Sequence, residues 1–404
     1  PDFPLADFIA ARGYAASEDF QAYNPAYLEK LNELYTEENL EHMKNYMTVK
    51  VALNFLDSLD QEAYDIYVQM RTAITGATRQ DDETAAYEAV KSLLLEPLEQ
   101  VYLEKYGSEK MKSDTTELCE NVISYYRTML EKEDWLSEET KQMAIKKLEN
   151  ISIHAAYPEK WYDYSGLDIS EDSFYEATLK IALTELERDI KYVNQKVDPD
   201  EWGVDILVCN AFYNPMNNSI NIMLGILGGA FYDENMSDEE MYGAIGVVIG
   251  HEISHAFDTT GAQFDEKGNL ANWWTEEDLQ IFHERAGKLA AYYDQIVPYT
   301  GETVKGSNIQ TEAIADMAGV KAMLSILSEK EDVDYDLFFR TYAGIWRMNN
   351  APEREETNLT QDSHPLGYLR TNVTVQQFDE FIETYDIKEG DNMYLAPEDR
   401  ILVW

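Results

Sequence analysis

The sequence predicts a mainly helical protein with one small β-sheet. Apolar residues recur at helical spacing through roughly the first 170 residues, for example in 27–35 and 118–130. Strand-forming residues are concentrated instead in 204–213 and 219–223, which flank the turn-forming segment 214–218. The first pattern indicates a helical scaffold, and the second indicates a β-hairpin that follows it.

The pattern also predicts two domains, a helical lobe over 1–170 and a second domain over 171–404. Ser137 is a typical helix start, because its side chain can cap a helix and the acids after it lie at the positive end of the helix dipole. Around 157–169 the helical spacing gives way to an aromatic-rich segment with Pro and Gly, which we interpret as the boundary. Further helices are predicted at about 173–191 and 338–348.

Composition excludes several classes of protein. A chain of 404 residues with 45% hydrophobic and 12% aromatic content can build large cores and is not disordered. The net charge of −45 argues against a nucleic-acid partner, because phosphate contacts need a basic surface. No stretch approaches the roughly 20 continuous apolar residues of a membrane span. Cys119 and Cys209 are too few for a disulfide scaffold, and their separation in sequence leaves open whether they pair.

Residues 251–255 read His-Glu-Ile-Ser-His at the end of an apolar helical run. On a helix, His251 and His255 lie one turn apart on one face, so both imidazoles can reach one zinc ion. Glu252 lies beside them, where its carboxylate could take a proton from a metal-bound water. Such a short motif also occurs by chance as a satisfied polar patch. Asp258 favours the zinc interpretation, because a nearby carboxylate can orient a ligating imidazole.

A catalytic zinc site needs a third protein ligand and an open position for water. The candidate ligand is Glu312, in the small-residue segment 311–319. Asp316 lies one turn further on, where it could accept a hydrogen bond from a ligating histidine and fix its tautomer. An acidic pair on a helix is more often a solvated face, but these two acids stand among Ala, Ile, Met and Gly. We therefore expect one zinc ion per chain.

Two further features fit a peptide-binding site. The hairpin over 204–223 offers an edge to which an extended peptide can add as a strand, although alone it would pass for a structural hairpin. His364 is predicted to lie in a loop, with Asp362 placed to hold its ring, although a lone loop histidine is more often only solvated. The remaining histidines lack metal-ligand spacing and are interpreted as structural: His42, His154 and His283.

These motifs, in this order, resemble the catalytic half of the neprilysin and endothelin-converting enzyme family of zinc metallopeptidases. The matching segments are 210–213, 247–258, 269–275, 312–316, 362–370 and the final Trp404. The family usually has Asn after the third ligand, where this chain has Ala313. Glycines typical of that helix are partly replaced, by Thr311, Met317 and Ala318. These departures concern packing, because every ligand position is filled.

The resemblance implies a thermolysin-like (gluzincin) catalytic domain, with the helical lobe covering the substrate chamber. It implies that His251, His255 and Glu312 bind zinc and that Glu252 is the general base. It assigns supporting hydrogen bonds to Asp258 and Asp316, stabilisation of the tetrahedral intermediate to His364, and substrate contacts to Asn210, Ala211 and Arg370, the last in a loop. We also expect Val247, Val248 and Trp346 to line the pocket for the residue after the scissile bond.

The predicted function is that of a zinc-dependent endopeptidase that cleaves oligopeptides on the amino side of large apolar residues. The main alternative is a catalytically silent homologue that binds peptides or supports an assembly. Its expected mark is loss of a ligand or of the base, and neither is lost in this sequence. A zinc-free helical adaptor would require the matching segments to be accidental.

The resemblance also bears on partners and location. Family members are longer, so we expect a missing N-terminal portion or a partner chain to complete the catalytic lobe and to cover an apolar face beside the helix of His251. The low cysteine content is similar to that of bacterial members. The chain opens at Pro1 without a signal peptide, and a targeting segment could precede it. By analogy, the expected location is extracellular or at the cell surface, with the cytoplasm as the alternative.

Overall fold

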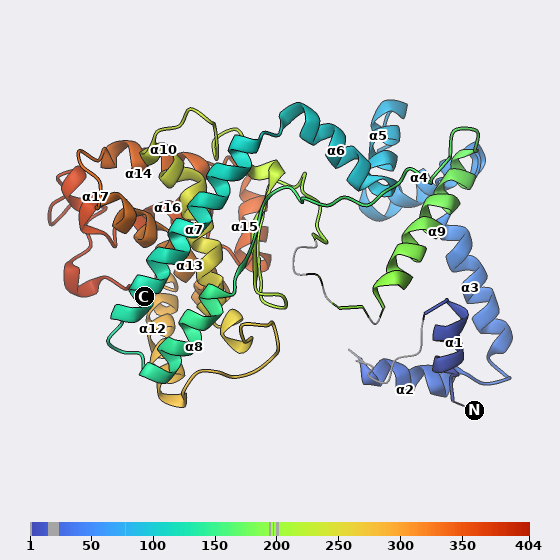
Figure 1. Cartoon of the computed structure of the whole chain (residues 1–404), viewed down its shortest axis with the longest axis horizontal. Coiled ribbons are helices and arrows are strands. Elements are labelled where there is room, and N and C mark those ends of the chain that lie inside the picture. The colour runs from blue at the N-terminus through green and yellow to red at the C-terminus, as the bar shows by residue number, and fades with distance from the viewer. Residues whose placement is uncertain (1, 15–23, 77, 194, 197, 199–201) are drawn as a thin grey trace. The chain divides into compact units, whose positions relative to one another are not determined.

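The computed structural model describes residues 2–14, 24–76, 78–193, 195–196, 198 and 202–404 (Figure 1). Helices predominate in this part of the chain, together with one three-stranded sheet, as the sequence predicts. The chain forms two compact units, one of Pro1–Val101 and Trp161–Asp198, the other of Tyr102–Lys160 and Pro199–Trp404. Within the described residues, no helix combines the length and the apolar character needed to cross a bilayer.

The first unit is built from helices. They are α1 (Leu5–Ala11), α2 (Pro25–Leu34), α3 (Leu40–Asn54), α4 (Gln61–Thr75), α5 (Asp82–Leu93) and α9 (Phe174–Tyr192), while α6 (Leu95–Tyr106) runs across the division into the second unit. Ser173 begins α9 through a reciprocal capping pair with Glu176, as expected for a helix from about residue 173. The expected helix at 27–35 corresponds to α2.

Helix α3 has an unusual surface for a helix of a globular protein. It has no buried residue, and its large apolar side chains are exposed, among them Tyr46, Met47, Val49 and Val51, each more than half exposed. By contrast, every residue of the helix that carries His251 is buried. The apolar face expected beside that helix stays a prediction, while a set of exposed apolar side chains is present on α3.

The second unit contains the sheet and most of the buried side chains. Its helices are α7 (Glu109–Lys132), α8 (Glu138–Glu149), α10 (Asp238–Met241), α11 (Val247–Ser254), α12 (Glu276–Tyr293), α13 (Gly306–Leu327), α14 (Tyr335–Ile345), α15 (Pro352–Gln361), α16 (Gly367–Val375) and α17 (Asp379–Thr384). Its shorter helical turns are η1 (Leu224–Ile226), η2 (Tyr242–Gly246), η3 (His255–Phe257), η4 (Gly261–Gln263) and η5 (Pro397–Asp399). Cys119 is buried in α7 and Cys209 is exposed, and both are free thiols.

The sequence suggested a single boundary at residue 170. The two compact units divide the chain at other positions. Residues 102–160 belong to the second unit, and 161–198 return to the first. The reason is the buried face of α7, which includes Leu118, Val122 and Tyr126 and packs on α11 and α13 (Figure 1). Helical spacing shows that a face is buried but not which partner covers it.

The sheet has the strand order β1-β3-β2. Strand β1 (Ser152–Ala156), which the sequence analysis did not foresee, pairs in parallel with β3 (Ser219–Met223). Strand β2 (Ala211–Asn214) pairs antiparallel with β3, so the predicted hairpin is present and β2 is an edge strand. Its first strand is shorter than the predicted 204–213, because the chain turns at Asp205, whose carboxylate accepts from Leu207 N at 2.8 Å.

Helices α11 and α13 pack unusually closely. A Cβ on Gly250 would lie 2.8 Å from Gly319 Cα, and one on Gly319 would lie 2.4 Å from the carbonyl oxygen of Val247. Only glycine permits this approach at either position. Of the four residues that depart from the family pattern, Ala313, Met317 and Ala318 are buried in α13, whereas Thr311 is half-buried and lines the cavity beside that helix. The close contact brings the side chains of both helices to one point.

Candidate metal centre

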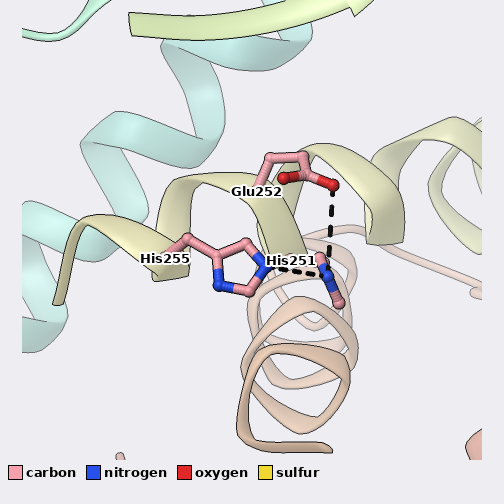
Figure 2. Close-up of side chains that lie close together, drawn as sticks. All are labelled: His251, Glu252 and His255. Atoms are coloured by element: carbon pink, nitrogen blue, oxygen red, sulfur yellow. Dashed lines mark hydrogen bonds and ion pairs between the residues drawn. The ribbon is translucent and has the colours of Figure 1, made fainter. Parts of the chain in front are cut away.

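The His-Glu-Ile-Ser-His motif lies on a helical stretch that changes its winding twice. It passes from α10 through the π-helical turn η2 into α11 and ends in the 3-10 turn η3. His251 lies in α11 and His255 opens η3, so the two imidazoles are one turn apart, with their Nε2 atoms close together (Figure 2). π-helical turns are rare and are frequently found at functional sites.

Three side chains bring their ligand atoms together. His251 Nε2 lies 3.1 Å from His255 Nε2 and 3.1 Å from Glu312 Oε2, and His255 Nε2 lies 3.4 Å from Glu312 Oε2. Zinc binds such atoms at about 2.0 to 2.2 Å, so tetrahedral ligands are about 3.3 Å apart. The three observed separations therefore fit one zinc ion with a fourth position left open. The two-nitrogen, one-oxygen donor set is that of a catalytic zinc site.

Each of these two histidines has a carboxylate against its Nδ1 atom. Asp316 Oδ1 lies 2.9 Å from His251 Nδ1, and Asp258 Oδ2 lies 2.6 Å from His255 Nδ1. With Nδ1 engaged in this way, the Nε2 lone pair of each ring is directed to the shared point. Both contacts are those expected from the sequence.

The charges around Glu312, the candidate third ligand, favour its ionised form. Burial by itself would raise the pKa of Glu312, but its hydrogen bonds with three imidazoles hold that pKa well below its usual range. Glu312 is therefore a carboxylate, the form that binds a metal. His364 is one of the three imidazoles, with Nε2 3.2 Å from Glu312 Oε2.

Glu252 is buried beside the candidate ligands and is held by the edge strand. Its Oε2 accepts a hydrogen bond of 3.0 Å from the backbone N–H of Tyr213 in β2, and its Oε1 lies 4.0 Å from His251 Nε2 (Figure 2). Burial raises the pKa of the Glu252 carboxyl, although the two histidines oppose this shift. A raised pKa makes this carboxylate a better proton acceptor near neutral pH.

His364 lies in the loop before α16, with its side chain 42% exposed. Asp362 Oδ1 lies 2.9 Å from His364 Nδ1 and also accepts from the backbone N–H of His364 at 3.0 Å. The ring orientation expected from sequence is therefore present, with Nε2 directed to the metal centre.

The sequence analysis placed Arg370 in a loop. In the structure it lies in the first half of α16. Its guanidinium donates to both oxygens of Asp316 and packs 3.6 Å from the centre of the Trp346 ring. Sequence analysis missed the pairing with Asp316 because the two residues are distant in the chain. The charge of Arg370 helps to hold the pKa of Asp316 below its usual value, although burial opposes it.

A cavity of about 520 Å³ opens over these residues. Besides the metal-centre residues, its lining includes Cys209, Asn210, Ala211, Val248, Trp346 and Arg370. Val247 is not part of this lining, contrary to expectation. Neighbouring residues on a helix point about 100° apart, and the backbone of Val247 packs instead against Gly319.

The edge of β2 borders the same cavity. In an antiparallel pair, the backbone groups of alternate residues face the neighbouring strand. Asn210 O accepts from Met223 N at 3.4 Å, whereas Tyr213 N–H points away from β3 toward Glu252. Ala211 shares the outward register of Tyr213, so its backbone amide and carbonyl face the cavity side of the sheet.

The fold and the geometry of this centre together define a class of protein: mainly helical and thermolysin-like (gluzincin), with a candidate zinc site. Two family models, both described as peptidase family M13, match residues 1–158 and 210–401. This chain belongs to peptidase family M13.

Relatives and solved structures agree with this assignment. The chain is 34% identical over 386 residues to a neutral endopeptidase of Lactococcus lactis, covering 95% of this chain and 61% of that protein. It is 33% identical to the neutral endopeptidase of Lactobacillus helveticus, covering all of this chain and 62% of that protein. The crystal structure of PEPO from Lactobacillus rhamnosis superposes with a TM-score of 0.80 at 33% identity, over 94% of this chain and 60% of that one. The open state of the Mycobacterium tuberculosis zinc metalloprotease ZMP1 gives a TM-score of 0.86 at 28% identity, over 100% and 65%. The chain thus spans about 61% of the length of the Lactococcus relative.

Proposed function

We propose that the protein is a zinc-dependent endopeptidase acting on oligopeptides. The observation that carries this proposal is the convergence of His251 Nε2, His255 Nε2 and Glu312 Oε2 at separations that suit one tetrahedral zinc. Bound zinc would polarise the scissile carbonyl and lower the pKa of water. The names of the relatives, neutral endopeptidases, support the same activity.

The other residues have roles that follow from their positions. Glu252, buried beside the ligands, takes the proton of the attacking water and passes it to the leaving amine. His364, directed at the centre from a loop, donates a hydrogen bond to the oxyanion that develops in the transition state. The outward edge at Ala211, with the side chain of Asn210 nearby, holds the substrate backbone as an added strand.

The proposed preference is for a large apolar residue after the cut bond. Val248 and Trp346 in the cavity lining support it, since apolar walls favour apolar side chains. The guanidinium of Arg370, in the same wall, is the proposed contact for a substrate carbonyl or carboxylate.

A single experiment separates this proposal from a catalytically silent homologue. The purified protein is analysed for metal and then given a peptide mixture, with and without a chelator, and the products are identified by mass spectrometry. We expect one zinc per chain and chelator-sensitive cleavage before large apolar residues. Zinc without cleavage would indicate the silent homologue, and a protein prepared without chelators that binds no zinc would contradict the proposal. Glu312→Ala, measured in parallel, should lose the metal.

We also propose that in the whole protein another polypeptide segment or a partner chain covers α3. Its exposed Tyr46, Met47, Val49 and Val51, and the greater length of the relatives, support this. The isolated chain should bind an apolar fluorescent dye, and Val49→Glu and Val51→Glu should reduce that binding. A monomeric chain in scattering measurements that binds no dye would contradict the proposal.

A further inference from the structure

Lys147 of α8 is a lysine whose side chain is almost completely buried, with 1% of its surface exposed. Its Nζ donates to the carbonyl oxygens of Gly261 at 2.6 Å and Phe264 at 2.8 Å. The ammonium also lies over two aromatic rings, 5.6 Å from the centre of Tyr213 and 5.8 Å from that of Trp273. A buried ammonium is costly to desolvate, so such a group persists where its contacts compensate for the cost.

The two carbonyls belong to the loop that follows the metal-binding helix. This loop folds back onto the helix end, since a Cβ on Gly261 would lie 1.9 Å from the carbonyl oxygen of His255. The loop also contains Asp258, whose Oδ1 accepts from Thr260 N and Gly261 N, both at 2.7 Å. The Oδ2 of the same carboxylate holds His255 Nδ1. Gly261 therefore has two roles: its backbone N–H donates to Asp258, and its carbonyl accepts from Lys147.

The charge of Lys147 suits this position. Burial lowers its pKa to about 8, while the charges of Asp258 and Asp265 favour its protonated form. At neutral pH the side chain is therefore mainly an ammonium that can donate to both carbonyls. Each carbonyl also has a second donor: Phe264 O accepts from Trp273 Nε1 at 2.9 Å, and Gly261 O accepts from the backbone N–H of Phe264 at 3.0 Å.

We propose that Lys147 is a positioning residue of the metal centre, which clamps the loop of Gly261 and so fixes the Asp258 carboxylate that orients His255. Lys147 acts through Asp258 and does not contact the ligands itself. This inference rests on the zinc site proposed above. It assigns to a helix outside the metal-binding motif a part in holding the metal.

The test compares zinc affinity by chelator competition in the metal-loaded protein and in Lys147→Met, which has a similar length but no charge or donor. The variant keeps the Lys147 carbonyl, which accepts from Asn218 Nδ2 at 3.0 Å, so its link to the hairpin is retained. We expect zinc to bind about 10- to 100-fold more weakly, the range for loss of an outer partner of a metal ligand. The visible spectrum of the cobalt(II)-substituted variant should also change, because the orientation of His255 is altered.

Lys146→Met is the matched control. Lys146 is the preceding residue, is about half exposed, and pairs with Glu266 near the same loop at 2.6 Å without reaching the Gly261 carbonyl. Its zinc affinity should equal that of the wild type. If circular dichroism shows that Lys147→Met is unfolded, Lys147→Gln takes its place, because the amide keeps a donor for one of the two carbonyls. Lys147→Gln should also bind zinc more weakly than the wild type.

A double-mutant cycle distinguishes positioning from general stabilisation. If Lys147 acts through Asp258, adding Lys147→Met to Asp258→Asn should weaken zinc binding little further. Fully additive losses, or wild-type affinity in a folded Lys147 variant, would overturn the proposal. A wild-type protein that binds no zinc would instead refute the zinc site itself, so the two failures are distinguishable.

Discussion

Asp316 joins Arg370 to His251, one of the proposed metal ligands. The carboxylate accepts from Arg370 Nε at 2.8 Å and from Nη2, while its Oδ1 lies 2.9 Å from His251 Nδ1. Arg370 is itself within 3.5 Å of His251 Nδ1 and is buried. A residue assigned to substrate binding by its motif therefore also orients the carboxylate behind His251, and the two roles can be separated by measurement.

Arg370→Met should affect both metal and substrate. Loss of the guanidinium leaves Asp316 without its charged partner, so we expect zinc affinity to fall by roughly 10-fold. With zinc in excess, the Michaelis constant should still rise, most for peptides that end two residues after the cut, because the planar donor for a substrate oxygen is gone. Chelator competition and steady-state kinetics measure the two effects. Arg340→Met, which removes an exposed arginine paired with Asp336, is the control. Unchanged zinc affinity and unchanged kinetics in Arg370→Met would exclude both the orienting role and the substrate-binding role of Arg370.

Glu252→Gln tests the proton acceptor. The amide keeps the size of the side chain and an oxygen for the Tyr213 N–H, so zinc should remain bound. Turnover should fall by several orders of magnitude, since the amide cannot take a proton from water. Metal analysis with single-turnover peptide cleavage checks both statements. Near-normal cleavage by the variant would exclude Glu252 as the base.

His364→Ala tests transition-state stabilisation. His364 lies in reach of Glu312 and also shares a possible metal-binding group with it and His251. If it acts as an oxyanion donor, kcat should fall by an amount equivalent to about 2 to 4 kcal/mol, with little change in the Michaelis constant and full zinc content. Loss of zinc in this variant would identify His364 as a ligand instead.

The sequence predicted those parts of the site that depend on local spacing. His251 and His255 are one turn apart, Asp258 is three residues beyond, and Glu312 and Asp316 are again one turn apart, so helix geometry alone aligns each group. Contacts between groups that are distant in the chain could not be predicted from local spacing. The match to a known order of motifs supplied the pairing of the two helices, and the glycine contact between Gly250 and Gly319 shows what permits it.

The features that sequence analysis missed all depend on contacts between distant segments. Strand β1 was hidden because 152–156 is short and exists as a strand only through pairing with β3. Lys147 stands in a helix with ordinary amphipathic spacing, where a lysine is typically solvated. Nothing in its neighbours signals that its ammonium reaches the loop of Gly261. The residues that surround its ammonium include Gly261, Phe264 and Trp273, which are more than 100 positions away in the chain. They indicate a site for a buried lysine only when α8 is known to lie beside them.

A last prediction concerns stability and its dependence on pH. Asp278, in the first turn of α12, is 3% exposed and accepts from Ser137 N at 3.1 Å and from the Ser137 hydroxyl. It thereby joins the start of α12 to the start of α8. Burial would raise its pKa, but hydrogen bonds from Ser137, Thr140 and Thr275 together hold the pKa below its usual value.

Because the pKa of Asp278 is lower in the folded protein than in the unfolded chain, its contribution to stability is complete above the unfolded value of 3.8 and is lost as the pH falls through the folded value. Asp278→Asn should therefore lower the free energy of unfolding by about 1 to 3 kcal/mol at pH 7, the scale of hydrogen bonds to a buried charge. The difference from the wild type should begin to shrink as the pH falls below 3.8, because the unfolded chain then takes up a proton at this carboxylate, and it should be lost once the folded carboxylate is protonated as well. Urea unfolding at pH 7 and at about pH 2.5 measures both values, with Glu277→Gln, an exposed neighbour in the same turn, as the control. A difference that stays constant between the two pH values would show that the ionised carboxylate is not what joins the two helices.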